Sequence, residues 1–356
     1  MLVYIVYPGG YNNRILSYLL YPLYASNYRN GIFFCRNDQD LWDAVRRHGK
    51  APVVVTGGNP TLRDNRLIRF LLKIRNADMS VSFFDTSPNP RSIKEPVVRL
   101  VNNYFKQSVY KNVNLYKKNQ TYGTAWMDWY AKCVGSPDRI ELRHTTPLSD
   151  GQISKIRLSW NIGYGLYPRT AATKRIPPYI AKYFGPKPVR LFMRKGIKPM
   201  GKKDKEIRVH ARMNKGEPGT VLNIHRSHFL HRLNDVFAIE SEKVPRSVYN
   251  WEFKSAAAVL SPFGSGEVCY RDFESALYGA ALIKPNMSHL VTRPNIYSDH
   301  EYIPLTWCGG NMESAIEEAL SRRYELANSA FESMQSWYSR FDEITEHFLH
   351  VSSRLK

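Results

Sequence analysis

The stretch SPFGSGEVCYRDFESALYGAALIKP, residues 261–285, determines how the second half of this chain folds. It starts with a glycine-rich turn at 264–266 and ends with the apolar run AALIKP. Between them, apolar residues recur at the spacing of one helical face, at Tyr270, Phe273, Leu277 and Ala280. Gly279 is a typical helix terminator. With the apolar run AAVL (257–260) before the turn, the stretch predicts a strand, a turn, a helix and a second strand.

Two glutamates lie in this unit, although the 356-residue chain has 51 Lys and Arg residues against 31 Asp and Glu, a net charge of +20. Glu274 lies at the edge of the apolar stripe, about 60° round the helix from Leu277 at roughly 100° per residue. Glycines let backbone amides approach a ligand, and a helix N-terminus favours an anion. We therefore expect a phosphate at the turn and ribose or sugar hydroxyls at Glu274. The alternative is a solvated or ion-paired glutamate, with Arg271 three residues before it.

The first 85 residues alternate between expected strands and expected helices. The strands are 2–7, 31–35, 51–58 and 80–85, and the helices between them are 13–28, 40–49 and 61–77. This alternation is typical of parallel strands joined by crossover helices in a doubly wound α/β sheet. The segment 95–134 mixes both periodicities and gives no clear assignment.

A second alternation covers 206–285, and helical periodicity covers 312–355. We therefore predict an α/β protein with two Rossmann-like domains that face a cleft, with C-terminal helices packing back across the domains. The predicted N-terminal domain is 1–175, and the predicted C-terminal domain is 176–335. A last helix, 336–356, is expected to cross back to the first domain. The linker region 176–205 is rich in Pro, Gly and Lys.

Charge and cysteine content narrow the function classes. The net charge of +20 indicates an anionic partner: nucleotide phosphates, a membrane surface or nucleic acid. The four cysteines have long spacings and no CxxC pair, and we read them as reduced intracellular thiols. The apolar segments near the N-terminus are too short for a signal peptide or a membrane span. We expect a cytoplasmic protein.

The opening stretch resembles the donor-site signature of GT-B glycosyltransferases: a glycine-containing turn, a glutamate, a second glutamate about two turns later, an alanine, a glycine and an apolar strand. Here these are FGSGE, Glu274, Ala276, Gly279 and ALI. The RDFE motif (271–274) and LSWNIG (158–163) look like a group of bacterial and large-virus transferases. Six residues separate the two glutamates where the usual retaining pattern has seven. Inversion and retention therefore both stay open.

This resemblance implies the GT-B arrangement, with 1–175 as the acceptor-side domain and 176–335 as the donor domain. It also implies a glycosyltransferase that uses a UDP-, GDP- or dTDP-sugar as donor substrate and no cofactor. The acceptor would be the hydroxyl of a glycan or of a lipid-linked glycan, and peripheral contact with a membrane surface is compatible with it. In such enzymes the second glutamate contacts the ribose, and the turn and helix N-terminus meet the diphosphate or the sugar. The resemblance carries over only to Gly264, Ser265, Gly266, Glu267 and Glu274. We also expect Arg212, which ends an expected strand, Arg226, near the start of an expected helix, and Arg271 to bind the donor.

The chemistry needs a group that accepts the acceptor's proton if the reaction inverts the anomeric centre. Asp85 ends an expected strand and is the first candidate for this base; its alternative is to cap the TSP turn that follows. His210 and His225 are further candidates, as base or as hydrogen-bond donor to the diphosphate. The loop YPGGYNNR (7–14) could contact either substrate or simply form a tight turn.

Metal ligands are not evident in the sequence. The only DxD-like motif, DQD at 38–40, is expected to start a helix. We therefore expect a metal-independent reaction in which Arg, Lys and backbone dipoles neutralise the diphosphate.

Two alternatives stay open beside the transferase hypothesis. The net charge, the many tyrosines and the basic helix at 63–77 would also suit a nucleic-acid-binding protein, although no known nucleic-acid-binding motif is present. A sugar transferase that acts on DNA bases would combine the two readings. Of these, we favour the transferase and do not expect nucleic acid to be the partner.

Overall fold

The computed structural model describes residues 2–6, 20–57, 65–134, 142, 144–164, 180, 184, 186–190, 205–236, 242 and 244–353. The chain forms two compact units, and each is interrupted in sequence. The first unit consists of 1–109, 147–194 and 338–356, and the second of 110–146 and 195–337.

The first unit is built on a parallel sheet of six strands. In chain order these are β1 (Val3–Val6), β2 (Ile32–Cys35), β3 (Val53–Gly57), β4 (Val81–Asp85), β5 (Asn103–Lys106) and β7 (Ile156–Leu158). Their spatial order is β2-β1-β3-β4-β5-β7, and every pair is parallel. This order is that of a flavodoxin-like doubly wound sheet, as the alternation in the first 85 residues predicts.

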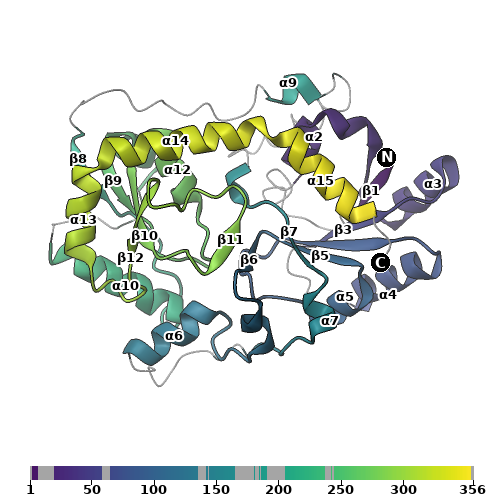
Figure 1. Ribbon diagram of the computed structural model, residues 1–356, viewed down its shortest axis with the longest axis horizontal. Helices are drawn as coiled ribbons and strands as arrows, with labels where there is room; N and C mark the ends of the chain where they lie inside the picture. The colour runs from purple at the N-terminus through teal and green to yellow at the C-terminus, as the bar shows by residue number, and fades with distance from the viewer. Residues whose placement is uncertain are drawn as a thin grey trace. The chain divides into compact units, whose positions relative to one another are not determined.

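Alternate residues of these strands face opposite layers of helices. One face, with Tyr4, Val53 and Phe83, packs against the helices α3 (Asp38–His48), α4 (Asn65–Asn76) and α5 (Glu95–Leu100). On the other face, the rings of Phe84 and Phe105 lie 5.9 and 4.7 Å from that of Phe348 in α15 (Phe341–Ser353). Figure 1 shows α15 beside α2 (Tyr21–Ala25) within this unit. The short helices of the unit are η1 (Asn27–Gly31), α7 (Asp150–Ile153), η3 (Ile162–Tyr164) and α9 (Pro186–Arg190).

The second unit is built on a four-stranded parallel sheet in the order β12-β10-β9-β8. Its strands are β8 (Ile207–His210), β9 (Ala256–Leu260), β10 (Ala281–Pro285) and β12 (Tyr302–Leu305). One core joins the sheet to α10 (Val221–Asn234), α13 (Met312–Ser321) and the start of α14 (Arg323–Ser339). A smaller core involves α11 (Arg246–Ser255), and α12 (Tyr270–Tyr278) contacts β9, β10 and α11.

Three further elements of the second unit are η2 (Val113–Lys117), α6 (Ala125–Val134) and β11 (Leu290–Thr292). Helix α6 packs against α10 (Figure 1). Strand β6 (Ser108–Tyr110) lies where the chain passes from the first unit into the second. Just after it, the N–H of Lys111 donates to the carbonyl of His289, 2.9 Å away.

The α/β class with parallel sheets is confirmed, but the units divide the chain differently from the predicted 1–175 and 176–335. Residues 110–146 belong to the second unit, because Trp126 and Tyr130 of α6 pack on His225 of α10 at ring distances of 4.8 and 4.9 Å. The C-terminal residues 338–356 belong to the first unit.

Some predicted segments fall outside the described residues, among them the loop 7–14 and most of the linker region 176–205. Strand β12, with the sequence YIPL, was not predicted from the sequence. Within the described part of the chain, every helix is too short or too polar to cross a membrane.

Candidate functional site

The glycine turn follows β9 at the carboxyl edge of the second sheet. This edge is where parallel α/β sheets bind their ligands. The N–H of Gly264 donates to the carbonyl of Gly266 at 2.9 Å, so the turn is closed on itself. Gly264 and Gly266 are buried, and Ser265 between them is exposed. The turn thus presents one residue to solvent at the start of the segment that leads into α12.

The first turn of α12 is fixed by Asp272, a fully buried carboxylate. It accepts hydrogen bonds from the Cys269 N–H (2.9 Å), the Ser261 hydroxyl (2.5 Å) and the Tyr297 hydroxyl (2.7 Å). The buried ammonium of Lys284 lies 3.1 Å away and balances its charge. The aspartate of the RDFE motif therefore holds the helix on β9 and β10, and these contacts assign it a structural role.

Two arginines lie beside the turn. Arg226 of α10 donates to the carbonyl of Phe263 at 2.9 Å, and its Nη2 lies 3.1 Å from where a Cβ on Gly264 would stand. Arg271, in the first turn of α12, donates to the carbonyl of Arg212 at 2.7 Å. Burial lowers the pKa of Arg226, and the charge of Arg271 acts in the same direction. The two guanidinium groups are thus close enough to repel each other, and a bound anion would relieve that repulsion.

Glu267 is the most unusual group of the site. It is fully buried, yet neither carboxylate oxygen has a hydrogen-bond partner among the described residues. The nearest cation candidate is His289, whose Nε2 lies 3.7 Å from Oε1. The ring of His289 lies 4.9 Å from that of Trp307 and 6.3 Å from that of Phe263. A buried carboxylate without a hydrogen-bond partner is costly, which indicates a group that a ligand completes.

Arg212 and His210 were predicted to meet the substrates, but in the structure both lie against Glu252. Arg212 makes a buried bidentate pair with Glu252 of α11, with both N–O distances 2.6 Å, and also donates to the carbonyl of Glu242. Its guanidinium is therefore committed within the protein, and the geometry gives no support to its assignment as a diphosphate ligand. His210 lies 3.4 Å from Glu252, and burial lowers the pKa of His210 to about 4. His210 is therefore neutral near pH 7.

Glu274 is paired within the protein as well. Its Oε1 accepts from Arg246 at 2.6 Å and its Oε2 from the hydroxyl of Tyr249 at 3.0 Å. Both partners lie on α11, and the Glu274 side chain is only 4% exposed. The ion-paired alternative considered for Glu274 matches this geometry, with Arg246 as the partner in place of Arg271. Ribose binding by Glu274 stays a prediction that would need these contacts to rearrange.

Asp85 lies in the first unit and is buried with a full set of partners. Its Oδ2 accepts from the Tyr104 hydroxyl at 2.8 Å and from the Lys106 ammonium at 3.0 Å. Its Oδ1 accepts the N–H of Ser87 at 2.8 Å, which is the turn-capping alternative. These contacts hold Asp85 in a buried ion pair, so the structure gives no support to a role as general base. His225 is likewise enclosed by aromatic rings in its own unit.

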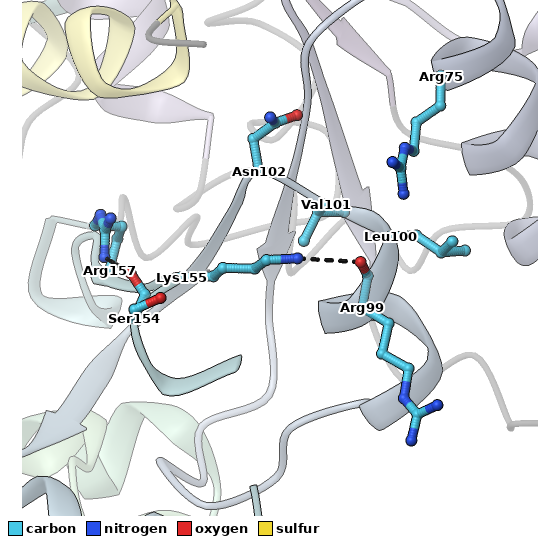
Figure 2. A pocket seen from close by; sticks show the side chains of 8 residues that line it. All are labelled: Arg75, Arg99, Leu100, Val101, Asn102, Ser154, Lys155 and Arg157. Carbon is cyan, nitrogen blue, oxygen red and sulfur yellow. Dashed lines mark hydrogen bonds between the residues drawn. The ribbon is translucent and has the colours of Figure 1, made fainter. Parts of the chain in front are cut away.

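One cavity of about 260 Å³ lies in the first unit, at the amino ends of β5 and β7. Four basic residues line it: Arg75, Arg99, Lys155 and Arg157. Figure 2 shows Lys155 reaching the carbonyl of Arg99 at the end of α5, at 3.0 Å. Such contacts cap the negative end of a helix dipole. Because the cavity lies at the edge opposite the strands' carboxyl ends, we do not assign it as the active site.

The structure thus places nine of the ten predicted site residues in the second unit, and Asp85 in the first. It brings together Arg226, Arg271 and the turn. The residues that sequence reasoning missed are His289 and the three α11 residues Arg246, Tyr249 and Glu252. The α11 residues recur at i, i+3 and i+6, a helical face that could have been noticed. His289 had no such signal, because it lies in an irregular segment after β10. Among the described residues, no three His, Cys, Asp or Glu side chains form a metal-binding group.

No protein-family model and no curated protein matches the chain. Among solved structures, Anabaena Alr3699/HepE in complex with UDP aligns over 100% of both chains, with 11% identity and a TM-score of 0.42. A protein named as a UDP-N-acetylglucosamine 2-epimerase from Listeria monocytogenes aligns over 98% of this chain and 97% of its own, with 10% identity and a TM-score of 0.38. The N-terminal domain of Candida albicans trehalose-6-phosphate phosphatase aligns over 99% and 97%, with 8% identity and a TM-score of 0.42. These TM-scores are too low to carry a functional argument.

Proposed function

We propose that the protein is a glycosyltransferase that moves a sugar from a nucleoside-diphosphate donor to a hydroxyl acceptor. One observation carries this proposal: a glycine turn at the carboxyl edge of a parallel sheet has two arginines beside it, and directly after it a buried glutamate that has no hydrogen-bond partner among the described residues. Guanidinium groups and a glycine turn suit phosphate oxygens, whereas a carboxylate without partners suits hydroxyl donors. A sugar nucleotide is a ligand that has both kinds of group.

The donor would bind with its diphosphate at Arg226, Arg271 and the turn. During transfer the bond between the sugar's anomeric carbon and the diphosphate oxygen breaks, so negative charge grows on the leaving group. Two arginines held in place by carbonyl contacts, at 2.9 and 2.7 Å, would stabilise that charge without reorganising. The same two cations support the expectation that no metal is needed. Chelation by EDTA should then leave activity unchanged, and its loss with recovery on manganese would contradict this.

We infer a glycan or lipid-linked hydroxyl as acceptor from the resemblance, and a net charge of +20 is compatible with contact at an anionic membrane surface. The acceptor hydroxyl would attack the anomeric carbon and lose its proton to a base. His210 is neutral near pH 7, which is the protonation state that a base needs. Because its side chain is buried, the groups that cover it would have to move before an acceptor could reach it.

The proposal is tested by nucleotide binding to matched variants. Arg226→Ala and Arg271→Ala each remove a cation beside the turn, and Arg75→Ala removes an exposed cation of the first unit as the control. A charge-assisted hydrogen bond contributes about 1.5–3 kcal/mol, so each site variant should bind a nucleoside diphosphate roughly ten- to a hundredfold more weakly. The control should bind as the wild type does. Calorimetry with UDP, GDP and dTDP gives these affinities and identifies the base.

If both site variants bind every nucleotide like the wild type, the turn is not the diphosphate site and the proposal fails. A second substitution, Glu267→Gln, distinguishes binding of the sugar from binding of the nucleotide. It should weaken binding of the nucleotide sugar and leave binding of the nucleoside diphosphate unchanged, because only the sugar brings hydroxyls to that carboxylate.

One feature of the first unit favours the alternative of nucleic-acid binding. The outer face of α4 carries exposed basic residues, Arg66, Arg69, Lys73 and Arg75. Such a stripe could follow a phosphate backbone, and its binding would weaken steeply with salt. Titration with duplex DNA at two salt concentrations decides between the two functions. Salt-dependent DNA binding without any nucleotide binding would favour the alternative.

A further inference from the structure

Two of the four cysteines, Cys133 and Cys308, lie near each other in the second unit. Cys133 is exposed in the last turn of α6, and Cys308 lies half-buried in the turn that follows β12. Each thiol is close enough to the other to change its pKa. The two residues are 175 positions apart in sequence, so the fold brings them together.

Neighbouring side chains place the two segments together independently of the thiols. Trp129 lies one helical turn before Cys133, and Trp307 directly precedes Cys308. Their rings meet edge to face with centroids 5.5 Å apart. Tyr130 also lies on α6, and its pKa is raised by burial and by the two nearby thiols. The contact between the cysteines is therefore part of a packed interface between α6 and the turn.

The surroundings also make the two thiols unequal. Burial opposes ionisation of Cys308, but hydrogen bonds from the Thr306 hydroxyl, the Gly310 N–H and the Cys133 thiol together lower the pKa of its thiol. The Thr306 Oγ1 lies 3.6 Å from its Sγ. For Cys133, burial and the neighbouring Cys308 raise the pKa. Cys308 therefore provides the more readily formed thiolate, and the thiolate is the reactive form of cysteine.

We propose that Cys133 and Cys308 form an intramolecular disulfide when the protein meets hydrogen peroxide. The Cys308 thiolate attacks one peroxide oxygen, the O–O bond breaks, and the hydroxide that leaves takes up a proton to become water. Cys133 then attacks the sulfenic sulfur through its thiolate, the S–O bond breaks, and a second water leaves. Two thiols and one peroxide thus give one disulfide and two waters.

The disulfide would fasten the turn at 306–310 to α6. That turn carries Trp307, whose ring lies 4.9 Å from His289, the neighbour of Glu267. Oxidation would therefore restrict a segment that packs against the candidate site. The formation of the bond itself does not depend on the proposed function, and its test needs no substrate.

The test uses the reduced full-length chain, freed of reductant and treated with hydrogen peroxide. After alkylation of the remaining thiols, non-reducing peptide mapping should find Cys133 joined to Cys308, with two of the four free thiols lost. In Cys133→Ser the sulfenic acid on Cys308 should persist, and dimedone should label it. In Cys308→Ser dimedone should label Cys133 more slowly. Cys269→Ser is the control and should form the same disulfide as the wild type.

The proposal is overturned if all four thiols survive peroxide, if Cys308 proceeds to sulfinic acid without a linked peptide, or if the link involves Cys269 or a second copy of the chain. Melting temperatures of the serine variants show whether each is folded. The wild-type map decides the question even if one variant is not.

Discussion

Replacing Glu274 distinguishes two possible roles of its carboxylate, a ligand of the ribose or a structural partner of α11. In the structure its carboxylate accepts hydrogen bonds from Arg246 and Tyr249, so Glu274→Ala should destabilise the second unit. A hydrogen bond to a charged group contributes about 1.5–3 kcal/mol. Arg246 is 51% exposed, and an ion pair with such a partner adds at most about 1 kcal/mol. We expect a loss of about 2–4 kcal/mol in the free energy of unfolding.

Two companion variants sharpen this prediction. Glu274→Gln keeps the shape and one acceptor oxygen, so it should cost about half as much as alanine. Tyr249→Phe removes the hydroxyl and keeps the ring, which should cost about 1 kcal/mol. Because the two groups are in contact, the double variant should lose less than the sum of the two single losses, by at least about 0.5 kcal/mol.

The assay is denaturant unfolding of the wild type and the four variants, with nucleoside-diphosphate binding measured on each by calorimetry. If Glu274→Ala unfolds like the wild type but has lost its affinity for the nucleotide, our reasoning is refuted. The carboxylate would then be a ribose ligand whose contacts with α11 contribute nothing to stability. If stability falls and affinity is kept, Glu274 is structural and the resemblance at this position does not extend to its role.

Three further predictions concern other buried groups. Asp85→Asn should lower the free energy of unfolding of the first unit by about 3–5 kcal/mol, because it leaves the buried Lys106 ammonium without a counter-charge. Adding Lys106→Met in the same chain should restore part of the loss. Burial lowers the pKa of His225 from 6.5 to about 3, so the unfolded chain binds a proton that the folded chain excludes. Stability should therefore fall as pH drops from about 6.5 towards 3, by up to about 4 kcal/mol, and the pH slope of unfolding should flatten in His225→Leu. Gly264→Ala should weaken nucleotide binding at little cost in melting temperature, because its methyl would stand 3.1 Å from the Arg226 Nη2; unchanged affinity would place the ligand elsewhere.

The strands and helices that alternate with clear periodicity could be predicted closely from the sequence. Helix α12 begins at Tyr270 and ends at Tyr278, and Gly279 after it adopts a positive φ of 70°, as the helix terminator should. Helix α3 likewise ends before Gly49, at a φ of 86°. Local patterns determine such elements, because an apolar face and a terminator act within a few residues.

The division into units could not be predicted in this way. The segment 95–134 mixes strand and helix periods, and the membership of residues 110–146 in the second unit depends on α6 packing against α10. Contacts between segments distant in sequence leave no periodic signal. The same limit applies to His289, which the fold brings to Glu267 from an irregular segment.

The pairing of charges is the part of the site that residue types alone predict least well. Sequence reasoning expected the arginines and acids of the second half to face a ligand, yet Arg212 and Glu274 are bound to partners on α11, a helix that carried no functional expectation. A buried charge needs a partner or a ligand, so the informative residues are those whose partners are missing. Glu267 meets that criterion among the described residues, and Arg226 would gain from an anion because burial and the charge of Arg271 lower its pKa. The candidate site is therefore best defined by Arg226, Arg271 and Glu267, and their variants test the proposed function more directly than those of any other predicted residue.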